Sequence, residues 1–235
     1  MNLSTTYAVF GISATTVLSL VYFLLLDFLK KKCNEDEKRI RAIYMWRKIS
    51  GFLLFGAIPA ILAWILFGLS PDYFGTGLND SLALWPWLLG ATVFFVALNF
   101  FNSRNPDLYG TYPEMRLKSW NLPMLLLAAG GWILYLAGYE FLFRGILLGS
   151  CYEAFGLWPA VAINLSLYSA LHLPKGMKEA IATIPFGALV CYLTIESHSI
   201  LPAIYLHSLQ AVSCEMFCIS RNPDMVFNFS KTHQP

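Results

Sequence analysis

Four ionisable residues stand within or at the ends of apolar stretches of this 235-residue chain. Glu140 and Arg144 are four residues apart in the sequence YEFLFRG, and His172 and His207 follow in later apolar runs. Residues at i and i+4 share one face of a helix, so Glu140 and Arg144 are expected to pair. An ionisable group inside a membrane helix costs roughly 2.5–3.5 kcal/mol and marks a functional site by default. These residues are therefore the candidates for chemistry.

Glutamate and histidine side chains that converge on one cavity are typical of hydrolysis. Glu140 and His172 can activate a water molecule as general bases. His207, with Gln210 nearby, can stabilise an oxyanion. Arg144 would hold Glu140 ionised against the pKa rise that burial causes. A zinc ion bound by Glu140, His172 and His207 is the alternative to metal-free activation, and the sequence does not decide between them.

Polar residues also recur along one face of two predicted helices. Asn164, Tyr168 and His172 are spaced by four, and His207 and Gln210 lie on one face of a later segment. These stripes and the glutamate–arginine pair indicate a shared interior cavity. Each residue also has a structural alternative: an intrahelical ion pair, a hydrogen bond between helices or, for Tyr168, packing.

The composition indicates which elements must position these side chains. The chain is 57% hydrophobic and 13% charged, about half the charged fraction of a typical soluble domain. Apolar runs of roughly 17–25 residues can cross a bilayer as helices. The chain contains seven apolar runs, at about 7–29, 49–69, 82–101, 122–154, 156–174, 179–197 and 199–220. We therefore predict an all-α, polytopic membrane bundle of about seven transmembrane helices, forming a single domain over residues 1–235.

Two of these runs have internal features. The fourth is too long for one straight crossing, and Gly130-Gly131 is where we expect a break that leaves a span near 132–152. The sixth contains Pro185 and Gly187, which membrane helices tolerate. The first run is too long for the apolar region of a signal peptide and is kept as a span.

The basic residues predict an orientation. Every Lys and Arg except Arg144 falls in segments that seven spans place on one side: 30–48, the third and fifth loops, and the C-terminal tail. The positive-inside rule then places the N-terminus outside and the C-terminus in the cytoplasm. The loop at 30–48 is expected to face anionic lipid headgroups, and we expect no nucleic-acid partner. The five cysteines include no C-x-x-C pair, so no disulfide framework is implied.

Three short motifs resemble those of the CAAX prenyl protease and bacteriocin-processing (CPBP, Abi) family of intramembrane proteases. "YEFLFRG" resembles the family's E-E-x-x-x-R at Glu140 and Arg144. "YSALH" resembles F-x-x-x-H at His172, with Tyr168 in place of Phe. "HSLQA" resembles H-x-x-x-N/D at His207. The likeness covers about 120–220 and implies a proteolytic core there.

The chain departs from the family pattern at two positions. Tyr139 replaces the first glutamate, usually assigned the catalytic role, and Ala211 replaces the final Asn or Asp. The Tyr-Glu form is similar to a prokaryotic subgroup that carries a stretch like "HLPKGMKE". In that stretch Glu179 either supplies the missing carboxylate or caps the N-terminus of the sixth helix, where the helix dipole favours an anion.

Three functional hypotheses follow. The first is a multi-pass intramembrane endopeptidase of a prokaryotic cell membrane, which uses Glu140, His172 and His207 on a membrane-associated peptide or protein. The second is a non-catalytic membrane binding or immunity protein on the same scaffold, suggested by Tyr139 and Ala211. A transporter is less favoured, because transporters often show paired halves, whereas the ionisable residues here occupy one half.

The depth of the histidines is a separate expectation. Centring each span in the bilayer puts His172 roughly 10 Å nearer the cytoplasm than His207, at 1.5 Å per residue. Arg144 is expected to contact Glu140 rather than substrate. The sequence names neither the substrate nor its cleavage site.

Overall fold

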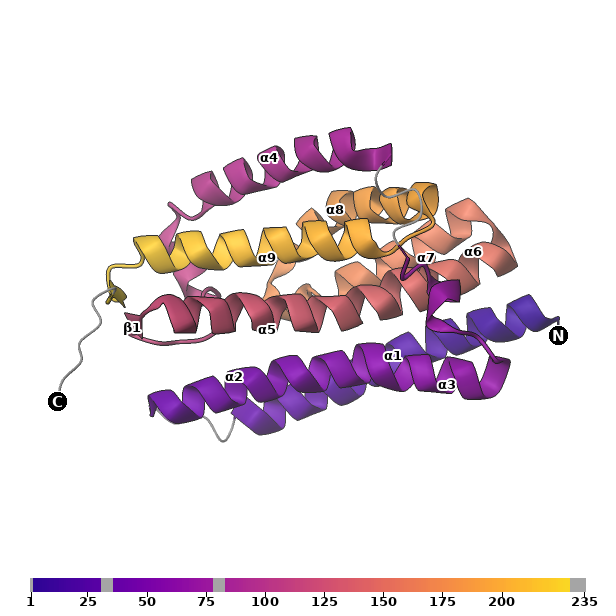
Figure 1. Ribbon diagram of the computed structural model, residues 1–235, viewed down its shortest axis with the longest axis horizontal. Coiled ribbons are helices and arrows are strands. Elements are labelled where there is room, and N and C mark those ends of the chain that lie inside the picture. Colours follow the sequence, from indigo (N-terminus) through magenta and orange to yellow (C-terminus); the bar gives the residue numbers. More distant parts are fainter. Residues whose placement is uncertain (1, 31–35, 78–82, 229–235) are drawn as a thin grey trace.

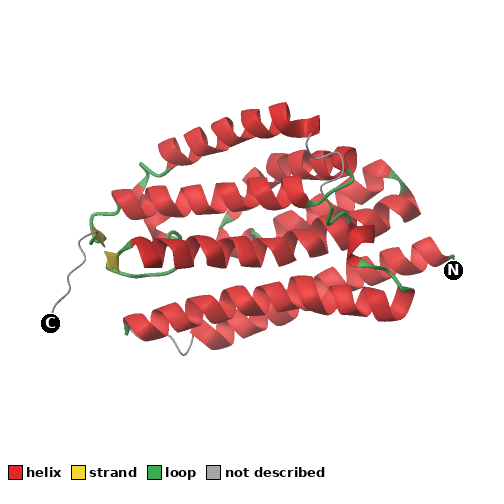
Figure 2. Ribbon diagram, viewed as in Figure 1, coloured by secondary structure: helices red, strands yellow, loops and turns green. Residues whose placement is uncertain are grey.

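The chain folds into a helical bundle with a two-residue parallel strand pair at one end (Figures 1 and 2). The computed structural model describes residues 2–30, 36–77 and 83–228. The α-helices are α1 Leu3–Lys30, α2 Glu37–Phe52, α3 Ile58–Phe67, α4 Trp85–Asn102, α5 Leu122–Glu140, α6 Gly149–Phe155, α7 Leu157–Ala170, α8 Met177–Ser197 and α9 Leu201–Arg221. The π-helices are η1 Leu53–Ala57 and η5 Phe141–Leu148; the 3₁₀ helices are η2 Pro71–Phe74, η4 Pro106–Gly110 and η6 Leu173–Lys175; the strands are β1 Ser119–Trp120 and β2 Val226–Phe227.

The predicted all-α membrane bundle is confirmed. Five helical rods are long and apolar enough to cross a membrane: Leu3–Leu29, Glu37–Phe67, Trp85–Asn102, Leu122–Phe155 and Met177–Ser197. Helices α7 and α9 complete the seven predicted crossings. The first has only 14 residues and the second carries several polar residues, so neither meets the same criterion. Helix α1 begins and α9 ends at opposite ends of the bundle (Figure 1), as an odd number of crossings requires.

The second predicted span begins earlier than its hydropathy suggests. A continuous rod runs from Glu37 through α2, η1 and α3 to Phe67. Asp36 caps this rod, since its side chain accepts a hydrogen bond from the Lys38 N–H. The predicted basic loop at 30–48 is therefore wrong from Glu37 onward, where it is helical. Residues 31–35 of that loop lie outside the described residues.

The predicted break at Gly130-Gly131 is also wrong. Helix α5 runs through both glycines to Glu140, and the change of helix type comes later, at η5. A Cβ on Gly131 would lie 2.7 Å from the Tyr44 ring and 3.1 Å from Lys48 Cγ. Gly131 therefore allows α2 to pack closely against α5 rather than interrupting the helix. In the sixth predicted span, α8 continues through Pro185, as expected.

Helix α5 lies at the centre of the bundle, between α2 and α9 (Figure 1). Its start is specified locally, because the Asn121 side chain accepts the Met124 N–H at 3.0 Å and Pro123 follows in the first turn. Helix α7 follows α6 through Gly156, whose φ of 81° favours glycine. The main core joins the inner faces of these helices. The central helix thus carries Glu140 into the interior, within reach of α7 and α9.

Candidate active site

Glu140 is the last residue of α5 and lies fully buried between two basic side chains. Arg144 Nη1 is 3.1 Å from Glu140 Oε2, and neither side chain is exposed. On the other side, His207 Nδ1 donates a hydrogen bond to Glu140 Oε1. The structure therefore brings together the predicted glutamate–arginine pair and adds a contact between α5 and α9. A buried carboxylate needs such partners, because burial disfavours its charged form.

A π-helix follows Glu140 directly. All eight residues of η5 are buried, and π segments are frequent at functional sites. The Asn164 side-chain amide donates to the Phe143 carbonyl at 2.7 Å, and the Cys191 thiol donates to Asn164 Oδ1 at 3.3 Å. Asn164, predicted to line the polar cavity, thus ties α7 to η5 and α8. This contact fixes α7 against the segment that carries Arg144.

The ring of Tyr168 lies at the middle of the site. Its centroid is 4.5 Å from Arg144 Cζ, a cation–π contact. The rings of His172 and His207 lie 4.7 Å and 6.1 Å from the same centroid. A Cβ on Gly187 would approach the Tyr168 ring to 3.1 Å, so this glycine lets α8 pack closely behind the ring. Both histidines therefore lie beside one tyrosine, although centring each span in the bilayer places them at different depths.

His172 occupies the turn after α7, where its hydrogen bonding fixes the tautomer. Its Nδ1 lies 2.8 Å from the Tyr168 carbonyl, which only accepts, so Nδ1 carries the hydrogen. Burial lowers the pKa of the His172 imidazole, and the Lys175 ammonium lowers it further. The neutral ring then offers an Nε2 lone pair. By the same argument Glu140 takes the Nδ1 hydrogen of His207 and leaves its Nε2 free.

Comparison with known families places these contacts in a recognised segment. Residues 118–212 match the model of a family described as Rce1-like, type II CAAX prenyl endopeptidase Rce1-like. This segment is similar to the Rce1-like family. Searches of curated proteins and of solved structures found no match. The matched residues run from just before β1 into α9 and contain all of the buried pair and both histidines. The resemblance predicted from three short motifs is confirmed.

The two departures within the Rce1-like segment lie close to the site. Tyr139 is 4% exposed, and its ring stacks on Phe143 at 4.4 Å and meets the His207 ring edge-on at 5.7 Å. Ala211 packs against the main core one turn after His207. The position of the family's first glutamate is thus held by a buried phenol, adjacent in sequence to the only carboxylate of this motif.

The structure places the other two predicted supporting residues differently. Glu179 lies in the first turn of α8. This position agrees with the second of its two predicted roles, that of an anion at the N-terminus of the helix. Glu179 Oε1 accepts from the Tyr112 hydroxyl at 3.1 Å and lies 3.2 Å from Lys175 Nζ. Gln210 is partly buried, and its hydrogen bond from the Asn99 amide is made through its backbone carbonyl. Glu179 therefore belongs to a neighbouring charged pair, and Gln210 helps fix α4 on α9.

The Rce1-like site does not fit the three-ligand zinc alternative as it is arranged. Both oxygens of Glu140 face Arg144 and His207 rather than an open position between the two histidines. Across the described residues, no group of three His, Cys, Asp or Glu side chains is placed to hold a metal ion. Zinc prefers several such donors around one point. No step is therefore assigned to a metal.

A second buried charge cluster lies beside the Rce1-like core and was missed from the sequence. Lys48 is 2% exposed, its ammonium lies 3.1 Å from the centroid of the Trp132 ring, and it pairs with Glu114 at 2.5 Å. Arg47 binds the other Glu114 oxygen at 2.5 Å, and the Glu114 N–H donates to buried Glu215 at 2.6 Å. Arg144 is therefore not the only buried base. Lys48 was assigned to a loop, whereas Glu215, an acid inside a predicted span, was a signal available in the sequence.

The charge of Glu114 reflects this environment. Burial alone raises the pKa of its carboxyl group, but Lys48 and Arg47 outweigh that effect and lower the pKa to about 2. The segment between α4 and α5 is thereby fastened to α2 and α9.

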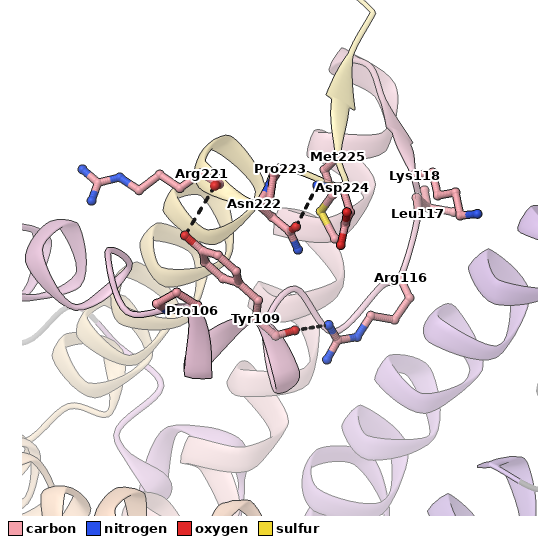
Figure 3. Close-up of a pocket in the computed structure, with 10 residues that line it drawn as sticks. All are labelled: Pro106, Tyr109, Arg116, Leu117, Lys118, Arg221, Asn222, Pro223, Asp224 and Met225. Carbon is pink, nitrogen blue, oxygen red and sulfur yellow. Dashed lines mark hydrogen bonds between the residues drawn. The ribbon is translucent and has the colours of Figure 1, made fainter.

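One surface pocket lies at the strand-pair end of the bundle (Figure 3). It has a volume of about 580 Å³ and is lined by Pro106, Tyr109, Arg116, Leu117, Lys118, Arg221, Asn222, Pro223, Asp224 and Met225. Its best-fixed base is Arg116, whose guanidinium donates to the Tyr109 and Gly110 carbonyls. The pocket shares no residue with the Glu140 site.

Proposed function

We propose that the chain is an intramembrane endopeptidase that cleaves a membrane-associated peptide or protein. The observation that carries the proposal is the buried Glu140 carboxylate, held by Arg144 and hydrogen-bonded to His207 Nδ1. His207 is 13% exposed, so its free Nε2 is within reach of water. A carboxylate that orients one nitrogen of an imidazole prepares the other nitrogen to act as a base.

The proton path follows from this arrangement. His207 Nε2 takes a proton from water as the water oxygen attacks the scissile carbonyl carbon. Glu140 stabilises the imidazolium that forms. When the C–N bond breaks, His207 returns the proton to the leaving amine. Glu140 therefore acts through His207, a different role from the direct water activation expected from the sequence. His172, with its own free Nε2 across the Tyr168 ring, accepts a hydrogen bond from the attacking water.

The substrate class is proposed from the family and from the burial of the site. The matched family is described as a CAAX prenyl endopeptidase, and a CAAX cysteine carries an isoprenoid lipid. A site inside a membrane bundle suits a peptide that such a lipid holds at the bilayer. We further propose a prokaryotic cell membrane as the location, from the Tyr-Glu form of the first motif.

The test is cleavage of a fluorogenic, lipid-anchored peptide by the purified full chain in vesicles. Glu140→Gln, His172→Ala and His207→Ala should each lower kcat by at least about 100-fold, the lower range for a lost catalytic base. The exposed Glu196 provides a matched control, and Glu196→Gln should cleave like the parent. Full activity in all three site variants would eliminate the proposal.

Metal removal gives a separate expectation. Because the donor geometry does not fit zinc, dialysis against a strong chelator should leave kcat unchanged. Loss of activity with EDTA, restored by added Zn²⁺, would instead favour the metal-dependent alternative.

A non-catalytic binding role is the competing function. One observation favours it: both oxygens of Glu140 already face basic partners inside the protein, Arg144 and His207, as in a purely structural ion pair. Under this role the three site variants that still insert and fold would retain the cellular phenotype of the parent. Loss of the phenotype at unchanged abundance would count against it.

A further inference from the structure

Tyr139 carries a buried hydroxyl that the proposed proton path does not use. The residue is 4% exposed, and its hydroxyl oxygen has no hydrogen-bond partner among the residues that the structure describes. Buried hydroxyls are normally hydrogen-bonded, since an unmet donor destabilises the folded state. A buried hydroxyl without an internal partner is free to donate to a ligand that binds beside it.

The surroundings of Tyr139 place this donor in the wall of the site. Its ring stacks on Phe143 within 12° of parallel and meets the rings of Tyr168 and His207 edge-on, at 6.0 Å and 5.7 Å. It precedes Glu140 on the same helix. The phenol is therefore packed against the imidazole that the proposed reaction uses as its base.

The other hydrogen-bonding groups nearest to Tyr139 are Glu140, the two histidines and Arg144. Glu140 accepts only, and the Nδ1–H of each histidine is already committed, to the Tyr168 carbonyl or to Glu140. The three Arg144 nitrogens have no hydrogen-bond partner among the described residues, but the guanidinium is unexposed and lies against Glu140 and the face of Tyr168. Attack on a peptide carbonyl places negative charge on its oxygen, which needs a donor aimed at it. The unpartnered phenol can supply that donor.

We propose that the Tyr139 hydroxyl donates a hydrogen bond to the carbonyl oxygen of the scissile peptide and stabilises the oxyanion of the tetrahedral intermediate. The inference rests on the proposed peptidase function. No bond to Tyr139 forms or breaks: the phenol keeps its proton, and the oxyanion collapses as the amine leaves. The residue that replaces the family's first glutamate thereby acquires a catalytic role of a different kind.

The test is Tyr139→Phe, which removes one oxygen and keeps the ring packing. We expect kcat to fall by about 10²–10³-fold, the effect of losing one oxyanion donor, with KM little changed. The melting temperature should stay the same or rise, because the lost hydroxyl had no internal partner. Tyr7 gives a matched control: it is 3% exposed, its hydroxyl is equally unpartnered, and its ring packs on Phe67 and Tyr73 outside the site. Tyr7→Phe should retain the parent kcat.

The outcomes separate the two proposals. If Tyr139→Phe matches the parent while Glu140→Gln is inactive, the role of Tyr139 is wrong and the peptidase stands. A Tyr139→Phe protein that loses kcat and melting temperature together would show a structural role and overturn the inference. A folded parent that cleaves no peptide overturns both proposals. A selective fall in kcat at unchanged stability, absent in Tyr7→Phe, supports both.

Discussion

Arg144 illustrates at the residue scale how a costly charge is tolerated in the membrane. Its guanidinium has one carboxylate partner, lies over the rings of Tyr168 and Phe143, and has no exposed surface. Removing one partner of a buried pair costs about 3–5 kcal/mol, because the other charge is stranded. Arg144→Ala should therefore lower both inserted protein and activity, whereas Glu140→Gln should spare folding more than activity. Arg144→Lys should rescue only partly, since Lys lacks the planar fork of Arg.

The test is to measure the amount of membrane-inserted protein and the rate of peptide cleavage in parallel for these three variants. An Arg144→Ala protein as abundant and active as the parent would mean that the arginine does not hold Glu140.

Glu114 makes a second residue-scale prediction, with a defined pH dependence. Its pKa is about 2 in the folded protein, below the ordinary 4.5, so its stabilisation is complete above pH 4.5 and is lost as pH falls toward 2. Glu114→Gln strands buried Lys48 and should destabilise the protein by about 3–5 kcal/mol at pH 7. In melting experiments, the difference between parent and variant should shrink steadily between pH 4.5 and 2. A difference independent of pH would contradict the ionic origin of the effect.

At the scale of elements, the contact between α2 and α5 depends on one glycine of a pair. A Cβ on Gly131 would lie 2.7 Å from the Tyr44 ring, whereas a Cβ on Gly130 would meet nothing within 4 Å. Gly131→Ala should destabilise the protein by about 1–3 kcal/mol through overpacking. Gly130→Ala should be neutral or stabilising by up to about 1 kcal/mol, through better helix propensity. Thermal unfolding of the two variants in one detergent checks this, and equal effects would argue against the close approach.

Local spacing predicted part of this arrangement and missed the rest for identifiable reasons. The Glu140–Arg144 pair follows from i,i+4 geometry on one helix. The contact between Glu140 and His207 joins residues 67 apart, so no local pattern reports it. The π-helix η5 has no sequence signature comparable to proline. Lys48 was placed in a loop because hydropathy marks only the apolar part of a rod that begins at Glu37.

Span centring does not report that both histidines lie beside Tyr168. Centring assumes that each run fills the bilayer, but α7 has only 14 residues, and His172 follows in a turn that folds back against Tyr168. The overall class of fold needed only composition and run length, whereas the site needed the tertiary contacts.

At the scale of the whole molecule, the orientation remains a prediction from the basic residues. Lys38, at the start of α2, and Asp72, in η2, are exposed at segments predicted to face opposite sides. In a protein with Cys33→Ser, where the other four cysteines are buried, an impermeant maleimide should label Asp72→Cys in intact cells. Lys38→Cys should react only after the membrane is opened. The reverse pattern would invert the topology.

The long rod from Glu37 to Phe67 links the site to the thickness of the bilayer. Its 31 residues span roughly 46 Å at 1.5 Å per residue, against about 30 Å of hydrocarbon. With Phe67 at one edge of the hydrocarbon, Lys48 lies roughly 28 Å away, close to the other edge. The Lys48–Glu114 pair then marks the boundary where acyl chains give way to headgroups. Lipids with longer tails would draw that ammonium inward or tilt the rod, so the host membrane itself helps set how this bundle closes.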